Sequence, residues 1–168
     1  MNRFGRVVLL AMIPVNLLLI AWVWFGRVIF GVGGWFLLLG LLVVVPALLL
    51  TLLTTTVLAY TQAARPRHLT THQAVAQVLV WFCLFTWGLF QPDFGDTKDS
   101  ELSFLTQITG ERSRSLLDAS YTLTGFSIFG AALAWLLLLG YLVFARQKVE
   151  PQHWAPLGAP PASPAAGR

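Results

Sequence analysis

Charged residues are scarce in this sequence. Asp, Glu, Lys and Arg make up 11% of its 168 residues and hydrophobic residues 57%, whereas soluble domains are nearer a quarter charged. The mean hydropathy is +0.72, which excludes an ordinary soluble domain. The net charge of +4 does not indicate nucleic-acid binding, because the basic residues stand at the ends of apolar segments, where positive charge orients membrane helices.

Cysteine occurs once, as Cys83, within an apolar run. A single cysteine excludes a disulfide framework and a cysteine-ligated metal site. Its apolar neighbours are typical of a thiol that packs as a small hydrophobe rather than one that attacks a substrate. No matching histidine accompanies the serines between residues 113 and 127, which argues against a serine hydrolase. We find no catalytic constellation and expect no enzyme activity and no cofactor.

Long apolar runs are abundant. Each is long enough, at 1.5 Å per residue, to cross a hydrocarbon core about 30 Å thick. They predict an all-α integral membrane protein whose four transmembrane helices form two hairpins. The membrane domain is residues 1–150, with helices at 7–25, 35–60, 71–90 and 121–144, and the Pro- and Ala-rich residues 151–168 are expected to be a disordered cytoplasmic tail.

Prolines and capping residues add local detail. Pro14 lies near the centre of the first helix and removes one amide, so a kink is expected there. Pro46 lies near the middle of the second helix. Thr70 followed by Gln73 has the pattern of a capping box and predicts that the third helix begins near Thr71.

The outer loop, residues 91–120, holds six of the seven carboxylates in the chain. A short helix is predicted within it, capped by Asp99 and ended by Gly110. Its apolar stripe of Leu102, Leu105 and Ile108 is expected to lie on the bundle or the headgroup layer, with Ser103 and Gln107 in water. The six carboxylates are Asp93, Asp96, Asp99, Glu101, Glu111 and Asp118.

Two metal sites are weaker hypotheses. Hard cations bind carboxylate oxygens, but the acids of the outer loop lack the spacing of an EF-hand, so a hydrated acidic loop is preferred. Histidines four residues apart need a third ligand, which the sequence does not place nearby, so a basic interfacial loop is preferred for them. The candidate ligands are Asp93, Asp96 and Asp99 for the first site and His68 and His72 for the second.

The fourth helix carries a seam of small residues at steps of 4, 3, 4 and 3. In lipid, close backbone approach along such a seam associates helices. The seam therefore predicts a helix-packing interface, either with this protein's own helices or with another subunit. Its members are Ser120, Thr124, Ser127, Ala131 and Ala134.

Basic residues predict the orientation of the helices. Seven lie on the side of the two termini and the 61–72 loop, and four lie on the other side. The positive-inside rule then places both termini in the cytoplasm. Nine arginines against two lysines, with many Ala, Gly and Pro, suggest a high-GC bacterial genome, so we expect the cytoplasmic membrane of a bacterium. The first group is Arg3, Arg6, Arg65, Arg67, Arg146, Lys148 and Arg168; the second is Arg27, Lys98, Arg112 and Arg114.

The leading functional hypothesis is a non-catalytic accessory or assembly subunit of a membrane complex. It would meet the lipid bilayer on its outer faces and a membrane-protein partner, or itself, through the outer loop and the fourth helix. The alternative is a small transporter or channel component acting as a homo-oligomer, with Asn16, Gln77 and threonines lining its path. No ionisable residue lies in the middle of any predicted helix, which argues against ion-coupled transport. A membrane enzyme with its acids in the outer loop is a third, weaker hypothesis.

The orientation can be tested with reporter fusions. Fusions after Gln62 and after Lys148 are expected to report the cytoplasm, and fusions near Gly110 the exterior, because of the basic-residue asymmetry. A cytoplasmic result at Gly110 would contradict the whole orientation.

Overall fold

The computed structural model of this chain describes residues 3–62, 68–93, 102–111 and 113–147. Apart from one isolated bridge, each regular element in these residues is a helix. The predicted disordered tail lies outside them. The elements are α1 (Arg3–Phe25), η1 (Gly26–Phe30), α2 (Trp35–Leu39), η2 (Gly40–Val44), α3 (Val45–Tyr60), α4 (Thr71–Phe90), α5 (Phe104–Thr109) and α6 (Arg114–Gln147).

Four helical stretches in the described residues are long and apolar enough to cross a membrane. The first joins α1 to η1, the second runs without interruption through α2, η2 and α3, and the others are α4 and α6. The prediction of an all-helical chain with four such helices is confirmed. The stretches are Arg3–Phe30, Trp35–Tyr60, Thr71–Phe90 and Arg114–Ala145.

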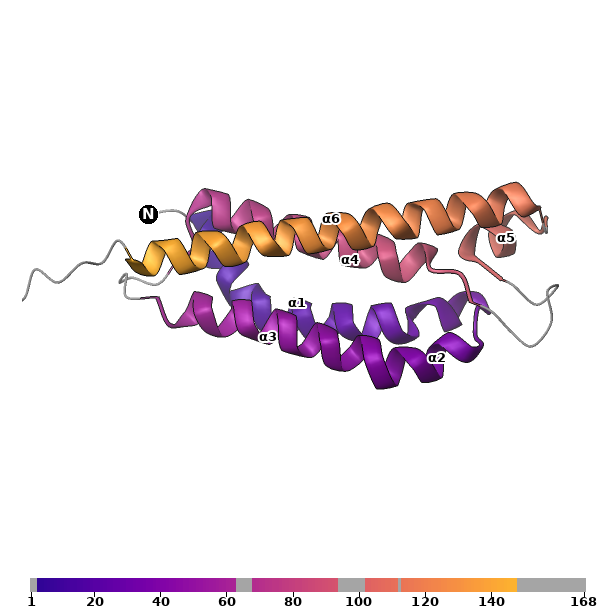
Figure 1. Ribbon diagram of the computed structural model, residues 1–168, viewed down its shortest axis with the longest axis horizontal. Coiled ribbons are helices and arrows are strands. Elements are labelled where there is room, and N and C mark those ends of the chain that lie inside the picture. Colours follow the sequence, from indigo (N-terminus) through magenta and orange to yellow (C-terminus); the bar gives the residue numbers. More distant parts are fainter. Residues whose placement is uncertain (1–2, 63–67, 94–101, 112, 148–168) are drawn as a thin grey trace, which may run out of the picture.

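The long helices lie side by side along the long axis of the molecule (Figure 1). α4 runs beside α6, and α1 runs beside α3. The most extensive contacts are those of α4 with α6 and of α4 with α1. α4 is therefore the central helix of the bundle, and α3 lies at its edge.

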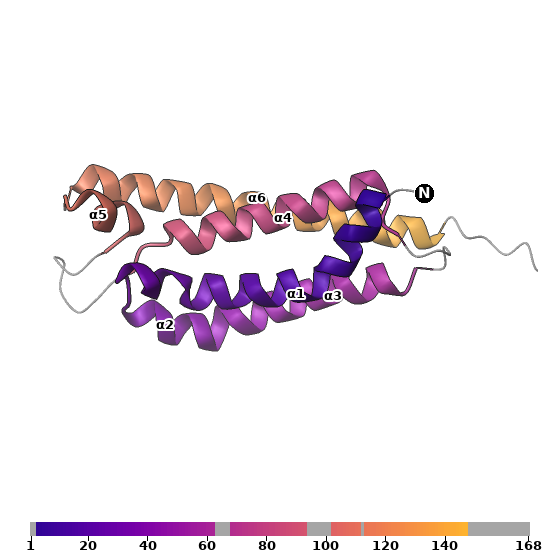
Figure 2. The ribbon, with the colours of Figure 1, turned by 180° about the vertical axis from the view of Figure 1, so that it is seen from behind.

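α1 is bent. Its beginning runs at a steep angle to the remainder and reaches the beginning of α4 (Figure 2). The bend follows from Pro14, which lacks an N–H group and crowds the preceding turn. At the contact, the amide of Leu69 donates to the carbonyl oxygen of Gly5 (3.4 Å). A Cβ on Gly5 would collide with the carbonyl of Leu69, so this approach requires glycine.

The second span contains a π-helical turn, Gly40–Val44, directly before Pro46. The proline ring would collide with the carbonyl of residue 42, four positions earlier, in a regular α-helix. A wider turn of π-helix moves that carbonyl away and lets the span continue. Proline thus changes the pitch of this span without ending it.

The third and fourth long helices differ in how well the sequence locates them. α4 begins at Thr71 behind a full capping box: Gln73 N donates to Thr70 Oγ1 (3.4 Å), and Thr70 N donates to Gln73 Oε1 (2.9 Å). α6 begins at Arg114, seven residues before the predicted start. Its 34 residues span about 50 Å at 1.5 Å per residue. The polar first turns continue the helix beyond the apolar run, so the edge of hydrophobicity is not the end of the helix.

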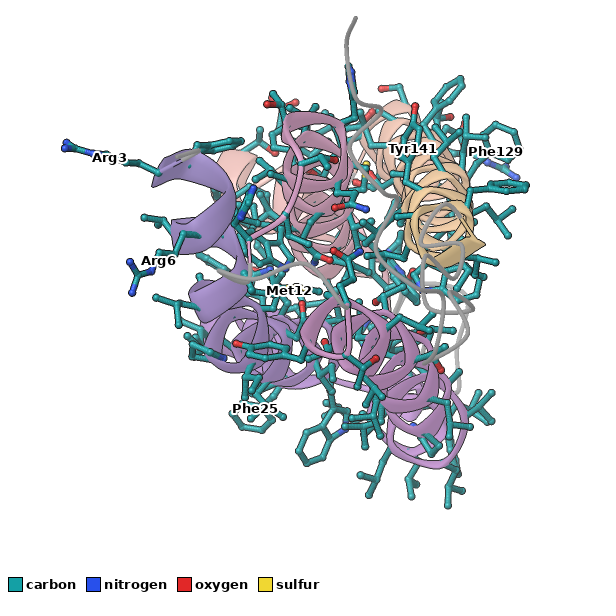
Figure 3. The ribbon with its side chains drawn as sticks, turned by 90° about the vertical axis from the view of Figure 1, so that its left-hand side faces the viewer. Arg3, Arg6, Met12, Phe25, Phe129 and Tyr141 are labelled. Carbon is teal, nitrogen blue, oxygen red and sulfur yellow. The ribbon has the colours of Figure 1, made fainter. Side chains whose placement is uncertain are left out.

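Large apolar side chains cover the outside of the bundle. Figure 3 looks along it from the end that carries the amino terminus, and Phe25 and Phe129 point outward while Met12 lies inside. Arg3 and Arg6 also point away from the helices. Two buried apolar clusters fill the interior, one around Met12 and one around Val23.

Candidate functional site

A buried polar cluster lies between α1, α3 and α4. Asn16, only 5% exposed, donates from Nδ2 to Thr56 Oγ1 (3.0 Å). Its Oδ1 accepts hydrogen bonds from Trp81 Nε1 (2.8 Å) and Gln77 Nε2 (3.4 Å). One amide therefore joins three helices.

The cluster fastens helices together. Hydrogen bonds between membrane helices contribute about 0.6 kcal/mol each on average, so the three bonds of Asn16 together are comparable to a small packing contact. The α3 threonines are also engaged. Thr51, Thr54, Thr55 and Thr56 donate to carbonyl oxygens one turn back, as hydroxyls in membrane helices commonly do. The polar side chains named for a transport path thus bond within the protein, except that Gln77 Oε1 accepts no hydrogen bond from the described residues.

A buried ion pair lies at the other end of the molecule from the amino terminus. Arg27 Nη2 is 3.4 Å from Asp93 Oδ2, and the two side chains are 0% and 3% exposed. The guanidinium also stacks over the ring of Phe36, 4.0 Å from its centroid. Asp93 Oδ1 accepts the backbone amide of Phe36 (3.0 Å). This pair ties the end of the first span to the start of the second and to the segment after α4.

The chain around the ion pair is held by backbone bonds. Asp93 N donates to Leu102 O (2.8 Å), and Leu102 N donates to Asp93 O (3.1 Å). Arg27 Nη1 lies 3.5 Å from the carbonyl oxygens of both Gln91 and Pro92. Residue 102 is thereby held beside residue 93, which fixes where α5 starts.

A chain of aromatic rings anchors α5 on the bundle. Phe104, at the start of α5, packs edge-on against Phe30 (4.8 Å between centroids) and Phe90 (5.8 Å). Trp22 continues the chain by contacting Phe30 at 6.5 Å and stacking on Phe85 at 5.1 Å. α5 therefore lies against η1, α4 and α6 (Figure 1).

The expected register of this short helix is wrong. α5 is capped by Ser103 rather than Asp99, through reciprocal hydrogen bonds between Ser103 and Thr106. Ser103, expected in water, is buried. Ile108, expected to face the bundle, is 65% exposed. The half-buried Phe104 packs on the bundle instead, while Gln107 is exposed as predicted. The helix ends at Gly110 as predicted, at φ 68°.

The preference for a hydrated acidic loop is wrong at Asp93, which is buried beside Arg27. A cation already faces that carboxylate, so it is poorly suited to a calcium site. Asp96 and Asp99 lie outside the described residues. His68 precedes α4 and is half-buried, whereas His72 is exposed and stacks on Tyr141 at 6.1 Å. In the parts of the chain that the structure describes, no three His, Cys, Asp or Glu residues are grouped to hold a metal ion.

The small-residue seam of α6 is buried along its whole length. The close approach of α6 to α4 is shown at Gly130, where a Cβ would lie 3.1 Å from Cys83 Sγ. Phe126 and Phe129, on other faces of α6, are 73% and 71% exposed. The buried seam residues are Ser120, Thr124, Ser127, Ala131 and Ala134.

No protein-family model, curated protein or solved structure matches this chain. The arrangement must therefore be interpreted from its own chemistry. The buried polar groupings around Asn16 and around Arg27 both connect helices.

Sequence reasoning missed the pairing of Arg27 with Asp93. The sequence analysis used Arg27 only to predict the orientation of the helices, and it treated Asp93 only as one of the carboxylates of the loop. One signal was present: each residue stands just beyond the end of an apolar run, and an antiparallel arrangement brings those two ends to the same side. Opposite charges just beyond the ends of consecutive apolar runs therefore predict an ion pair.

The packing of the α6 seam can be tested by overfilling it. Ser127→Leu and Ala134→Leu insert bulk between two backbones, which typically costs about 1–3 kcal/mol, and both variants are expected to melt earlier in detergent. Phe129→Leu is the matched control, because it also yields leucine but on an exposed face. The packing would be wrong if Phe129→Leu proved the most damaging of the three.

Proposed function

We propose that this chain is a non-catalytic accessory or assembly subunit of a complex in the bacterial cytoplasmic membrane. In this proposal it crosses the membrane four times as two helical hairpins, with both termini in the cytoplasm. The observation that carries the proposal is the Asn16 cluster, whose amide is bonded to three other side chains. A polar group committed in this way stabilises a scaffold and leaves little to bind or move a solute.

In this proposal the partner binds to side chains that the described helices leave exposed. The α6 seam is already covered within the chain, so it is not the contact in this proposal. Ile108 is exposed on α5, which follows the bridge between Asp93 and Leu102 beside the ion pair. Isolated exposed apolar residues are normal on lipid-facing helices, but Ile108 lies outside the four apolar spans, where a protein partner would shield it from water.

The alternative is a transporter or channel component that works as a homo-oligomer. One observation favours it. Gln77 Oε1 is buried and accepts no hydrogen bond from the described residues, and a buried polar atom of this kind normally has a partner. A solute or water reaching the bundle interior would supply that partner.

The proposal is tested by photocrosslinking in intact membranes. A benzophenone side chain at position 108 is expected to give one discrete heavier species on illumination, because that site would face the partner. The matched control is position 29 on η1, where Ile29 is also strongly exposed but lies within the first apolar span. Purification in mild detergent is then expected to retain the crosslinked protein as a complex.

Three results would distinguish the two functions. A discrete heterologous product from position 108 alone supports an accessory subunit. Products that contain only copies of this chain, together with a solute that raises the melting temperature, would support the alternative. Identical diffuse labelling from positions 108 and 29 would contradict a partner at the outer loop.

A further inference from the structure

The first turns of α1 carry one exposed face that combines positive charge with apolar surface. Arg3 and Arg6 are both exposed and stand one turn apart on this face. Val7 and Leu10 continue it and are 65% and 62% exposed. The opposite face, which includes Gly5, is buried against the beginning of α4. The segment therefore presents two guanidinium groups and two aliphatic side chains to the surroundings of the bundle.

The bend in α1 decides where this face points. Because the beginning of α1 runs at a steep angle to the long helices (Figure 2), it crosses the end of the bundle instead of continuing along it. In the view along the bundle, Arg3 and Arg6 extend sideways and outward from the helices (Figure 3). A helix that lies across the end of a membrane-spanning bundle is in the headgroup layer, with its apolar side chains at the boundary with the acyl chains. The two arginines then reach the headgroups of lipids beside the protein.

The charge of the two arginines is not balanced within the described part of the chain. Neither Arg3 nor Arg6 forms an ion pair with a described residue. The described carboxylates are those of Asp93, Glu111 and Asp118, which belong to the segments at the other end of the bundle (Figure 1). A planar guanidinium binds a phosphate through two parallel hydrogen bonds, and phosphate is the anion of the headgroup layer. The exposed face of the first turns therefore complements a phospholipid in both its charge and its apolar part.

We propose that Arg3 and Arg6 bind the headgroup of an anionic phospholipid whose acyl chain lies along Val7 and Leu10. The inference rests on the membrane-spanning arrangement proposed above. An anionic lipid is preferred to phosphatidylcholine, because the choline cation competes with the arginines for its own phosphate. A basic side chain near an anionic membrane surface contributes about 1 kcal/mol, which is a preference of about fivefold for each arginine and about 25-fold for the two.

The probes are a phosphatidylglycerol and a phosphatidylcholine that each carry a nitroxide high in one acyl chain. The full-length protein, with Cys83→Ala and a fluorophore on Val7→Cys, is placed in vesicles of the two unlabelled lipids at low salt. A nitroxide quenches the fluorophore on contact, so the quenching by the two probes gives the lipid preference at position 7. Labelled phosphatidylglycerol is expected to quench much more strongly, in line with the preference above. Equal quenching by the two probes would overturn the proposal.

Variants assign the preference to the two arginines. Arg3→Gln and Arg6→Gln, made together, remove both charges from exposed positions and are expected to abolish the preference at position 7. Arg114→Gln is the matched control, because Arg114 is also exposed but begins α6 at the other end of the bundle, and it is expected to keep the preference. If the double variant fails to fold, each single variant is expected to lower the preference about fivefold. An unchanged preference in a folded variant would contradict the proposal.

Two further measurements separate this site from other sources of the preference. Inorganic phosphate at matched ionic strength is expected to leave the quenching unchanged, and loss of the preference on its addition would show a site for free phosphate instead of lipid. A fluorophore on Phe129→Cys, at an exposed position of α6, is expected to show no preference, and the same preference there would overturn a site at α1. Quenching by either probe reports membrane insertion. Failure of the accessory function would appear in the crosslinking from position 108 and would leave the lipid preference unchanged.

Discussion

Hydrocarbon offers no partner to a polar group, so each such group inside a membrane protein must be satisfied by the protein itself. In the membrane arrangement proposed above, this constraint favours contacts between the helices that carry polar side chains. Asn16 bonds to side chains from α3 and α4, and Gln73 Nε2 reaches the carbonyl oxygen of Tyr141 on α6 (3.3 Å). Apolar side chains gain little by leaving lipid for each other, so these bonds and close packing between small residues specify the arrangement.

The same constraint is stronger for the buried ion pair of Arg27 and Asp93, because both groups are charged. Removing two charges from water is costly, and a buried pair often contributes little net stability, yet deleting one partner leaves an uncompensated charge and typically costs about 3–5 kcal/mol. Here the pair also selects a geometry, because Asp93 holds both the amide of Phe36 and the backbone of Leu102. The position of α5, and with it the exposed face that carries Ile108, depends on this contact.

Local signals in the sequence were sufficient for the four apolar helices and for the capping box of Thr70 and Gln73. They were insufficient where the structure depends on residues distant along the chain. The start of α5 is set by the pairing of residues 93 and 102 and by the packing of Phe104 on Phe30 and Phe90, none of which has a local pattern. α6 begins early for another reason: the apolar run marks only the hydrophobic part of the helix, and its polar first turns continue the helix beyond that run.

The central claim, that the ion pair of Arg27 and Asp93 fixes this end of the bundle, is tested most directly by a double-mutant cycle in detergent. Asp93→Asn keeps an oxygen for the amide of Phe36 but removes the charge, and Arg27→Met removes the cation while keeping an unbranched side chain. We predict that each single variant loses thermal stability and that the double variant is more stable than either, because it leaves no unpaired charge. A double variant whose loss equals the sum of the two single losses would contradict the claim.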